Sequence, residues 1–332
     1  MELNLTRPIL SIGIPTYNRE ELLIRAFESI KSIGPNNIEI LIGNNYVSKK
    51  ISFDQFNLKK PNQELKIFNH QENLGAIANF NFLLDKAQGE YFIWLCDDDY
   101  YLPGFFDILI PLLNNNSHSK PEVIFPKYIL SSELKKGIQA ISNSNNVIEY
   151  LKSPEYLKFY LQGKYSVLGL YGVYKKSYLL EKGGMIQMGT SPSGLYSDNR
   201  LAILAGVDLN KIAYINFPQI VFNDHDDSCS TTLKDLIAYQ TGQKDLLNEI
   251  LPLVKDHKIS GKNIEGLIRF YFIPHHLCVQ KRLKSISIPG FFIFLKLIIT
   301  CVPKIGFHSF INIIFDFLKL FLKGLVKPFK TL

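Results

Sequence analysis

Residues 91–99 read YFIWLCDDD, an apolar run joined directly to three consecutive aspartates. A short apolar run of this kind predicts a strand that is buried on both faces, as in a parallel sheet. Open α/β sheets bind their ligands outside the carboxyl ends of the strands. We therefore expect Asp97, Asp98 and Asp99 to lie at a sheet edge that a ligand can reach.

Strand and helix signals alternate through the residues that precede this stretch. Apolar runs predict strands at 9–14, 38–43 and 65–68, and the apolar spacing over 22–30 and 77–87 is typical of helices. This alternation predicts an α/β fold, a doubly wound and mostly parallel sheet. Further on, the sequence predicts a strand at 168–174, a helix from Asn199, a strand at 212–215 and helices over 231–285.

Three adjacent carboxylates repel one another, and at least one takes up a proton unless a cation is nearby. A hard divalent ion resolves the repulsion, because Mg²⁺ or Mn²⁺ binds one or two carboxylates and leaves its other positions to water and substrate phosphates. The sequence therefore predicts a Mg²⁺ or Mn²⁺ site at Asp97–Asp99. The competing interpretation is a solvated cluster that caps a helix.

The charge of the chain argues against a nucleic-acid partner. The net charge is +7, but residues 281–332 hold nine Lys/Arg and one acid, so residues 1–280 carry about −1. Four widely separated cysteines form no Cys-x-x-Cys pair, and the N-terminus lacks the pattern of a secretory signal. These features favour a protein of the reducing cytosol.

The basic charge belongs to an apolar tail at about 286–332. The apolar run at 291–299 contains Lys296 and falls short of the ~20 residues that a spanning helix needs. Beyond it, polar residues recur every three or four positions and form one stripe: His308, Asn312, Asp316, Lys319, Lys323 and Lys327. This pattern predicts a helix lying on an anionic membrane surface, or alternatively a helix packed on the domain that precedes it.

Several segments together resemble the catalytic half of family 2 glycosyltransferases, which have the GT-A fold. They are SIGIPTYNR at 11–19, ENLG at 72–75, AQGEY at 87–91 and the aspartate triplet, which matches the DxD metal motif. The resemblance implies an enzyme that binds a nucleotide-sugar. It assigns nucleotide-sugar binding to Pro15, Thr16, Tyr17, Arg19, Asn73, Asp97 and Asp98, and metal binding to Asp97 and Asp99. FNDHDDSCS at 222–230 also resembles a loop of the family near the diphosphate. His225 is therefore a candidate metal ligand or phosphate donor, and a surface-loop histidine is the alternative.

The chain departs from the family at one position. After the second strand the family usually has an aspartate that accepts a hydrogen bond from the base, and Asn44 stands at that place. An amide oxygen can also accept from a base N–H, whereas its NH₂ group donates. Asn44 is accordingly a candidate nucleotide contact, and a turn asparagine is the alternative.

The resemblance also implies a general base about a hundred residues past the triplet. Asp198, in SDNRL at 197–201, fits this position, although it could equally cap the helix that follows. An inverting displacement is implied by the resemblance, with Asp198 taking the proton of an acceptor hydroxyl. GLYGVY at 169–174 also resembles a segment of the family on the acceptor side.

The predicted organisation is a catalytic domain at 1–230 and a helical extension at 231–332. The catalytic domain comprises a nucleotide-sugar half, 1–113, and an acceptor half, 114–230. The expected acceptor is a glycan, either lipid-linked or part of a surface polysaccharide, reached from the cytoplasmic face of the membrane. Two alternatives remain open: a sugar-nucleotide nucleotidyltransferase, and a membrane-docked module that binds nucleotide-sugars without catalysis.

Overall fold

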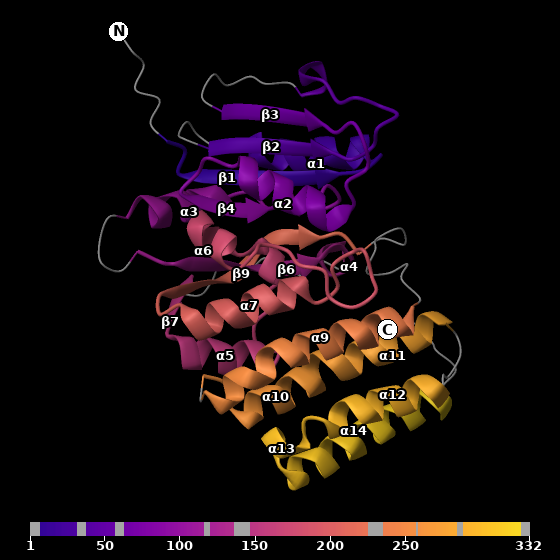
Figure 1. The fold of residues 1–332 in the computed structure, drawn as a ribbon. Helices are drawn as coiled ribbons and strands as arrows, with labels where there is room; N and C mark the ends of the chain where they lie inside the picture. Colours follow the sequence, from indigo (N-terminus) through magenta and orange to yellow (C-terminus); the bar gives the residue numbers. More distant parts are fainter. Residues whose placement is uncertain are drawn as a thin grey trace. The chain divides into compact units, whose positions relative to one another are not determined.

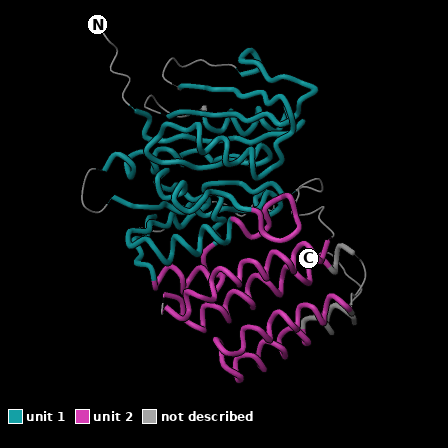
Figure 2. The backbone as a smooth tube through the Cα atoms, viewed as in Figure 1, with its two compact units in different colours: residues 1–153, 166–186, 198–228 teal, residues 154–165, 187–197, 229–332 magenta. Residues whose placement is uncertain are grey.

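The computed structural model describes residues 7–31, 38–56, 63–115, 120–135, 147–224, 235–256, 258–283 and 288–326. The chain divides into two compact units, shown in Figure 2. The first comprises Met1–Ser153, Ser166–Ile186 and Asp198–Ser228, and the second comprises Pro154–Tyr165, Gln187–Ser197 and Cys229–Leu332. The predicted boundary near residue 230 stays a prediction, since both units are built from separate segments.

The first unit is an α/β structure around one sheet (Figure 1). Its strands are β1 (Leu10–Thr16), β2 (Ile38–Asn44), β3 (Gln63–Asn69), β4 (Tyr91–Trp94), β5 (Tyr100–Tyr101), β6 (Val123–Leu130), β7 (Ile148–Leu151), β8 (Val173–Lys175) and β9 (Ile212–Phe222). Its helices are α1 (Glu20–Lys31), α2 (Ala76–Lys86), α3 (Phe105–Asn114), α4 (Ser131–Lys135), α6 (Lys176–Glu181) and α7 (Ser197–Asp208), with short 3₁₀ turns η1 (Phe53–Gln55) and η2 (Gly169–Tyr171).

The strand order is β3-β2-β1-β4-β8-β6-β9-β5, and β7 pairs with β9. Strands β3, β2, β1 and β4 are parallel, and so are β6 and β9, whereas β8 runs antiparallel to both β4 and β6. The sheet is therefore mixed, and most of its paired residues belong to parallel ladders. The four predicted strands of the first hundred residues are confirmed. The apolar runs of β1, β2 and β4 are buried on both faces, whereas β3, at the edge of the sheet, is only partly buried.

The segment predicted as a strand at 168–174 differs from the expectation. Gly169–Tyr171 forms the 3₁₀ turn η2, and only Val173–Lys175 pairs in the sheet. The turn follows from close packing, because a Cβ on Gly169 would lie 1.8 Å from the backbone oxygen of Asp198. The glycine thus lets η2 contact the first turn of α7, at a distance that no other residue permits.

The second unit is helical. It holds α5 (Ser153–Leu161, from Pro154 on), α9 (Leu236–Lys255), α10 (Gly261–Leu267), the π-helical turn η3 (Ile268–Phe272), α11 (Ile273–Leu283), α12 (Ile288–Ile299), α13 (Val302–Ile305) and α14 (Phe307–Val326). Phe317 of α14 packs against Phe291 and Phe294 of α12. Figure 1 shows these two helices side by side. None of the described helices combines the length and apolar content that crossing a bilayer requires.

Candidate active site

The aspartate triplet follows β4 directly, at the carboxyl edge of the parallel strands. Asp97 and Asp99 are buried, with 5% and 1% of their surface exposed. Thr16, the last residue of β1, donates a 2.6 Å hydrogen bond from its hydroxyl to Asp97 Oδ2. Arg19 lies 3.3 Å from Asp97 Oδ1 and 2.8 Å from Asp98 Oδ2. The ends of β1 and β4 therefore bring four of the predicted site residues into direct contact.

Asp99 is held by residues from much later in the chain. The Tyr171 hydroxyl donates to Asp99 Oδ2. The backbone N–H of Asn223, just past β9, donates a 2.7 Å hydrogen bond to Asp99 Oδ1. Both carboxylate oxygens of Asp99 thus have a donor, and the side chain is fixed in one orientation.

Burial raises the pKa of two of the three aspartates, Asp97 and Asp99. It raises the pKa of Asp97 to about 6, against the opposing hydrogen bond from Thr16, and the neighbouring charge of Asp98 raises this pKa further. The pKa of Asp99 is raised well above its usual range by burial and by the charge of Asp98. A carboxylate in this position is costly to ionise without a positive charge beside it. The triplet is therefore an electrostatic arrangement that a cation would stabilise.

The donor set fits a hard divalent ion in part. Ligand atoms of Cys96, Asp98 and Asp99 all lie within 4.8 Å of one another. Carboxylate oxygens are the ligands that Mg²⁺ and Mn²⁺ prefer, whereas the Cys96 thiol suits softer metals. Asp98 and Asp99 would accordingly hold the ion. Asp97, which was expected as a ligand, lies outside this group and is engaged by Thr16 and Arg19.

Asp198 lies in the first turn of α7 and is half-buried. Burial raises the pKa of its carboxyl group, while backbone N–H groups, that of Asn199 first, oppose the rise. A raised pKa makes the carboxylate a better proton acceptor near neutral pH. Its backbone is packed against Gly169 of η2. Because Tyr171 belongs to the same turn, η2 links the neighbourhood of Asp198 to that of Asp99.

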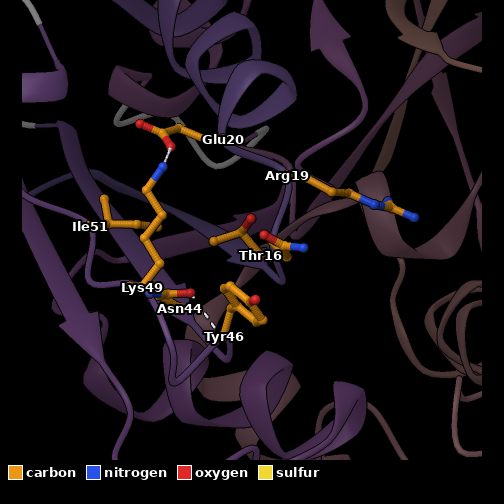
Figure 3. A pocket seen from close by; sticks show the side chains of 8 residues that line it. Thr16, Arg19, Glu20, Asn44, Tyr46, Lys49 and Ile51 are labelled. Atoms are coloured by element: carbon orange, nitrogen blue, oxygen red, sulfur yellow. Dashed lines mark hydrogen bonds and ion pairs between the residues drawn. The ribbon is translucent and has the colours of Figure 1, made fainter.

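The residues expected to contact the nucleotide lie around the ends of β1 and β2. Figure 3 shows the pocket lined by Thr16, Arg19, Glu20, Asn44 and Tyr46, with Asn18, Lys49 and Ile51 completing it. Tyr17 is 51% exposed, and its ring lies edge-on to that of Tyr46 with 5.3 Å between the ring centroids. Pro15 pairs with Gly43 inside the sheet. Pro15 and Tyr17 do not line this pocket.

Two other predicted residues lie in different surroundings. Asn73 is exposed in the loop before α2, where its Oδ1 accepts a 2.9 Å hydrogen bond from the Gly75 N–H. His225 lies outside the described residues. Sequence reasoning placed Tyr171 only within a segment that resembles the acceptor side, and it missed the contact of Tyr171 with Asp99. It also missed the Glu20–Lys49 ion pair of the pocket. No local pattern marks either contact, since each joins residues from distant elements.

Comparison with known proteins places this site in a family. Residues 11–159 match the family described as Glycosyl transferase family 2, a match that spans β1, the triplet and the strands between them. The chain is similar to glycosyl transferase family 2 over residues 11–159. The predicted resemblance is confirmed, and the match includes the proposed metal ligands and every residue of the pocket in Figure 3.

Curated relatives of the chain are bacterial glycosyltransferases. An uncharacterized glycosyltransferase of Rickettsia felis is 30% identical over 139 residues, 42% of this chain and 23% of the relative. GalNAc(5)-diNAcBac-PP-undecaprenol beta-1,3-glucosyltransferase of Campylobacter jejuni is 34% identical over 108 residues, 32% of this chain and 35% of the relative. The chain thus spans about a quarter to a third of the length of these relatives.

Solved structures share the fold of this chain at low sequence identity. S. aureus TarS 1-349 in complex with UDP-GlcNAc has a TM-score of 0.64 at 14% identity, over 90% of this chain and 82% of that one. The mannosyltransferase PcManGT from Pyrobaculum calidifontis, in complex with GDP-Man and Mn2+, has a TM-score of 0.51, over 97% of this chain and 88% of that one. These likenesses confirm a GT-A-like fold with C-terminal helices.

Proposed function

We propose that the protein transfers a sugar from a nucleotide-sugar to a hydroxyl group of a lipid-linked or surface-polysaccharide acceptor. One observation carries this proposal: buried, mutually repelling carboxylates lie at the sheet edge and bond directly to Thr16 and Arg19, which line the adjoining pocket. A nucleoside diphosphate needs a cation for its phosphates and a pocket for its nucleoside. This arrangement offers carboxylates that can hold the cation, and the pocket for the nucleoside lies next to them.

The residues divide the chemistry between donor and acceptor. Asp98 and Asp99 would hold Mg²⁺ or Mn²⁺, which supplies positive charge for the leaving nucleoside diphosphate. Arg19 adds a fixed guanidinium beside the triplet and favours the same developing charge. Asp198 would accept the proton of the acceptor hydroxyl as its oxygen attacks the anomeric carbon from the opposite face. A single displacement of this kind inverts the anomeric configuration.

Related proteins support the choice of substrates. UDP-GlcNAc and GDP-Man with Mn2+ are bound in the two solved structures, and the C. jejuni relative acts on an undecaprenol-linked glycan. A relative from Escherichia coli, 29% identical over 103 residues, is a putative colanic acid biosynthesis glycosyl transferase. We infer from them a nucleotide-sugar donor and an acceptor that is a glycan carried by a lipid.

The decisive experiment follows release of free nucleoside diphosphate from a panel of nucleotide-sugars, with and without Mn²⁺. We expect release by the full chain to depend on the metal, and Asp99→Asn to lower it by at least about a hundredfold, since the variant removes a metal-bound charge. Metal-independent release, or an Asp99→Asn variant as active as the parent, would contradict the proposal. A nucleotidyltransferase would instead release pyrophosphate from a nucleoside triphosphate and a sugar phosphate.

The role of Asp198 is tested separately from donor binding. Asp198→Asn keeps the size of the side chain and its capping capacity but removes the basic carboxylate. We expect kcat to fall by roughly a hundredfold to ten-thousandfold, with nucleoside diphosphate affinity unchanged. If the variant turns over like the parent, Asp198 is a helix cap and another group accepts the proton.

We further propose that the protein is peripheral to the cytoplasmic face of the cell membrane and docks through α12 and α14. On these helices Phe292, Ile293, Ile299, Phe307 and Phe315 are between 48% and 70% exposed. Exposed apolar side chains flanked by cations favour an anionic bilayer surface, and Lys296 and Lys319 are both exposed.

The polar stripe of α14 is divided between two surroundings, since Lys319 is exposed and Asp316 is engaged by Arg269. Asp316 lies 3.2 Å from Arg269 of η3, so this part of the stripe faces the helices of its own unit. Phe307 and Phe315, rather than Asp316, occupy the outward face of α14. The apolar face supplies the burial in lipid, and the lysines beside it supply the attraction to anionic headgroups.

A further inference from the structure

Both atoms of the Asn44 amide group form hydrogen bonds inside the protein. Its Nδ2 donates to the backbone oxygen of Lys49 at 2.8 Å and to Asn69 Oδ1 at 2.9 Å. Its Oδ1 accepts a 2.9 Å hydrogen bond from the Tyr46 N–H. Only 2% of the residue is exposed. Both amide protons are therefore used within the chain, and the oxygen already has a backbone donor.

Asn69, the last residue of β3, extends this network to Ile51. Ile51 ends the short loop in which Tyr46 and Lys49 form hydrogen bonds with Asn44. Asn69 Oδ1 accepts from the Ile51 N–H at 2.8 Å, and Asn69 Nδ2 donates to the Ile51 backbone oxygen at 2.9 Å. Together the two asparagines bind both ends of the segment Tyr46–Ile51. This segment contributes Tyr46, Lys49 and Ile51 to the pocket of Figure 3.

The network also explains why residue 44 is an amide. An aspartate there would place an acceptor oxygen against two other acceptors, the Lys49 backbone oxygen and Asn69 Oδ1. Asn69 cannot resolve the conflict by turning over, because both its atoms are bonded to Ile51. A buried acceptor that faces acceptors loses its hydrogen bonds and is repelled. The carboxylate that related chains are expected to have here is incompatible with this loop.

Glu20 and Lys49 form the charged pair of the pocket. The Lys49 ammonium donates to Glu20 Oε2, and Gln55 donates to Glu20 Oε1. Figure 3 shows the Lys49 side chain extended toward Glu20, while Arg19 points away from this pair. A second cavity of about 370 Å³ adjoins the pocket and shares Asn44, Tyr46 and Lys49 with it. Among the described residues that line either cavity, Glu20 carries the only carboxylate.

We propose that Asn44 is a positioning residue that fixes the loop Tyr46–Ile51, and that the Glu20–Lys49 pair recognises the nucleobase in its place. The Glu20 carboxylate accepts from a base N–H, and the Lys49 ammonium donates to a base carbonyl or ring nitrogen. The pair offers an acceptor next to a donor, which is what the polar edge of a base requires. Hydrogen bonding from Lys49 lowers the pKa of Glu20, so the acceptor stays ionised.

This inference rests on the proposed function for its ligand, and two variants test it. The binding of UDP, GDP, CDP, ADP and inorganic pyrophosphate is measured by calorimetry with Mn²⁺ present. We expect Glu20→Gln to weaken the best nucleoside diphosphate about tenfold, or ~1.4 kcal/mol, without weakening pyrophosphate. Glu64→Gln is the matched control, because Glu64 also pairs with a lysine, Lys66 at 3.0 Å, but lines neither cavity.

Asn44→Asp tests the positioning role without any ligand. We expect its Tm to fall by roughly 3–8 °C, because the buried network loses hydrogen bonds, and its nucleotide affinity not to exceed that of the parent. An unchanged Tm with tighter nucleotide binding would show that residue 44 reads the base and would overturn the inference. Equal nucleotide binding by Glu20→Gln and the parent would remove Glu20 from recognition.

The outcomes separate this inference from the proposed function. If the parent protein binds none of the four nucleoside diphosphates with Mn²⁺, the proposed function fails and base recognition by Glu20 fails with it. The Tm of Asn44→Asp still decides the positioning role in that case. If the parent binds a nucleotide and Glu20→Gln binds it equally well, the proposed function stands and base recognition by Glu20 is wrong.

Discussion

Removal of a single oxygen atom, that of the Tyr171 hydroxyl, is expected to alter the candidate metal site. The hydroxyl is buried and donates to Asp99 Oδ2, one of the two carboxylates that would hold the ion. Groups that orient a metal ligand commonly contribute ten- to a hundredfold to metal affinity or activity. We therefore predict that Tyr171 is a positioning residue whose effect is visible in the metal dependence of the proposed reaction.

We predict that Tyr171→Phe lowers turnover by roughly tenfold to a hundredfold and raises the Mn²⁺ concentration needed for half-maximal activity. Steady-state kinetics at varied Mn²⁺ measure both effects. Tyr91→Phe is the matched control, because that buried hydroxyl donates to the Pro121 backbone oxygen at 2.7 Å, away from the triplet. An unaltered Mn²⁺ dependence in Tyr171→Phe would show that the hydroxyl serves packing alone.

At the scale of elements, α12 and α14 present a paired apolar face whose affinity for lipid can be measured. We predict that the double variant Phe292→Ser, Phe315→Ser binds phosphatidylglycerol vesicles at least about tenfold more weakly than the parent in flotation assays. Ile237→Ser on α9 is the control, since Ile237 is 60% exposed but lies on another helix. Equal flotation of parent and double variant would assign these phenylalanines to a different partner, such as a second copy of the chain.

At the scale of the whole molecule, His276 couples the stability of the helical unit to pH. It is 1% exposed, and its ring lies against Phe294 of α12 and Phe317 of α14. Burial lowers its pKa from 6.5 to about 4. The unfolded chain therefore takes up a proton near pH 6.5, whereas the folded chain resists protonation until about pH 4, so stability falls as the pH drops between these values.

We predict that the free energy of unfolding falls by about 2 kcal/mol between pH 7 and pH 5 because of His276 alone. Chemical denaturation at the two pH values measures the loss, and His276→Gln, which cannot ionise, should show a difference smaller by that amount. The same pH dependence in His276→Gln and the parent would show that His276 is accessible to protons in the folded state.

The sequence predicts the first half of the sheet because its signals are local. The runs at 9–14 and 38–43 are apolar except for Ser11 and Glu39, and the run at 91–96 is apolar throughout. Each contains a strand whose end is followed by polar residues of the site. The placement of β8 between β4 and β6 depends on pairings across many residues, so no local pattern marks it. No local pattern marks the contacts of Tyr171 and Asn223 with Asp99 either, because these residues lie 72 and 124 positions further along the chain.

Those separations have a consequence for how the enzyme is assembled during synthesis. A nascent chain that has emerged as far as α3 already contains the whole aspartate triplet, yet the donors that orient Asp99 have still to be translated. We therefore expect the candidate metal site to be completed late, when β8 and β9 join the sheet. Swapping the first 115 residues between related enzymes would leave Asp99 dependent on a foreign tyrosine and a foreign backbone amide, and such chimeras should lose metal response before they lose their fold.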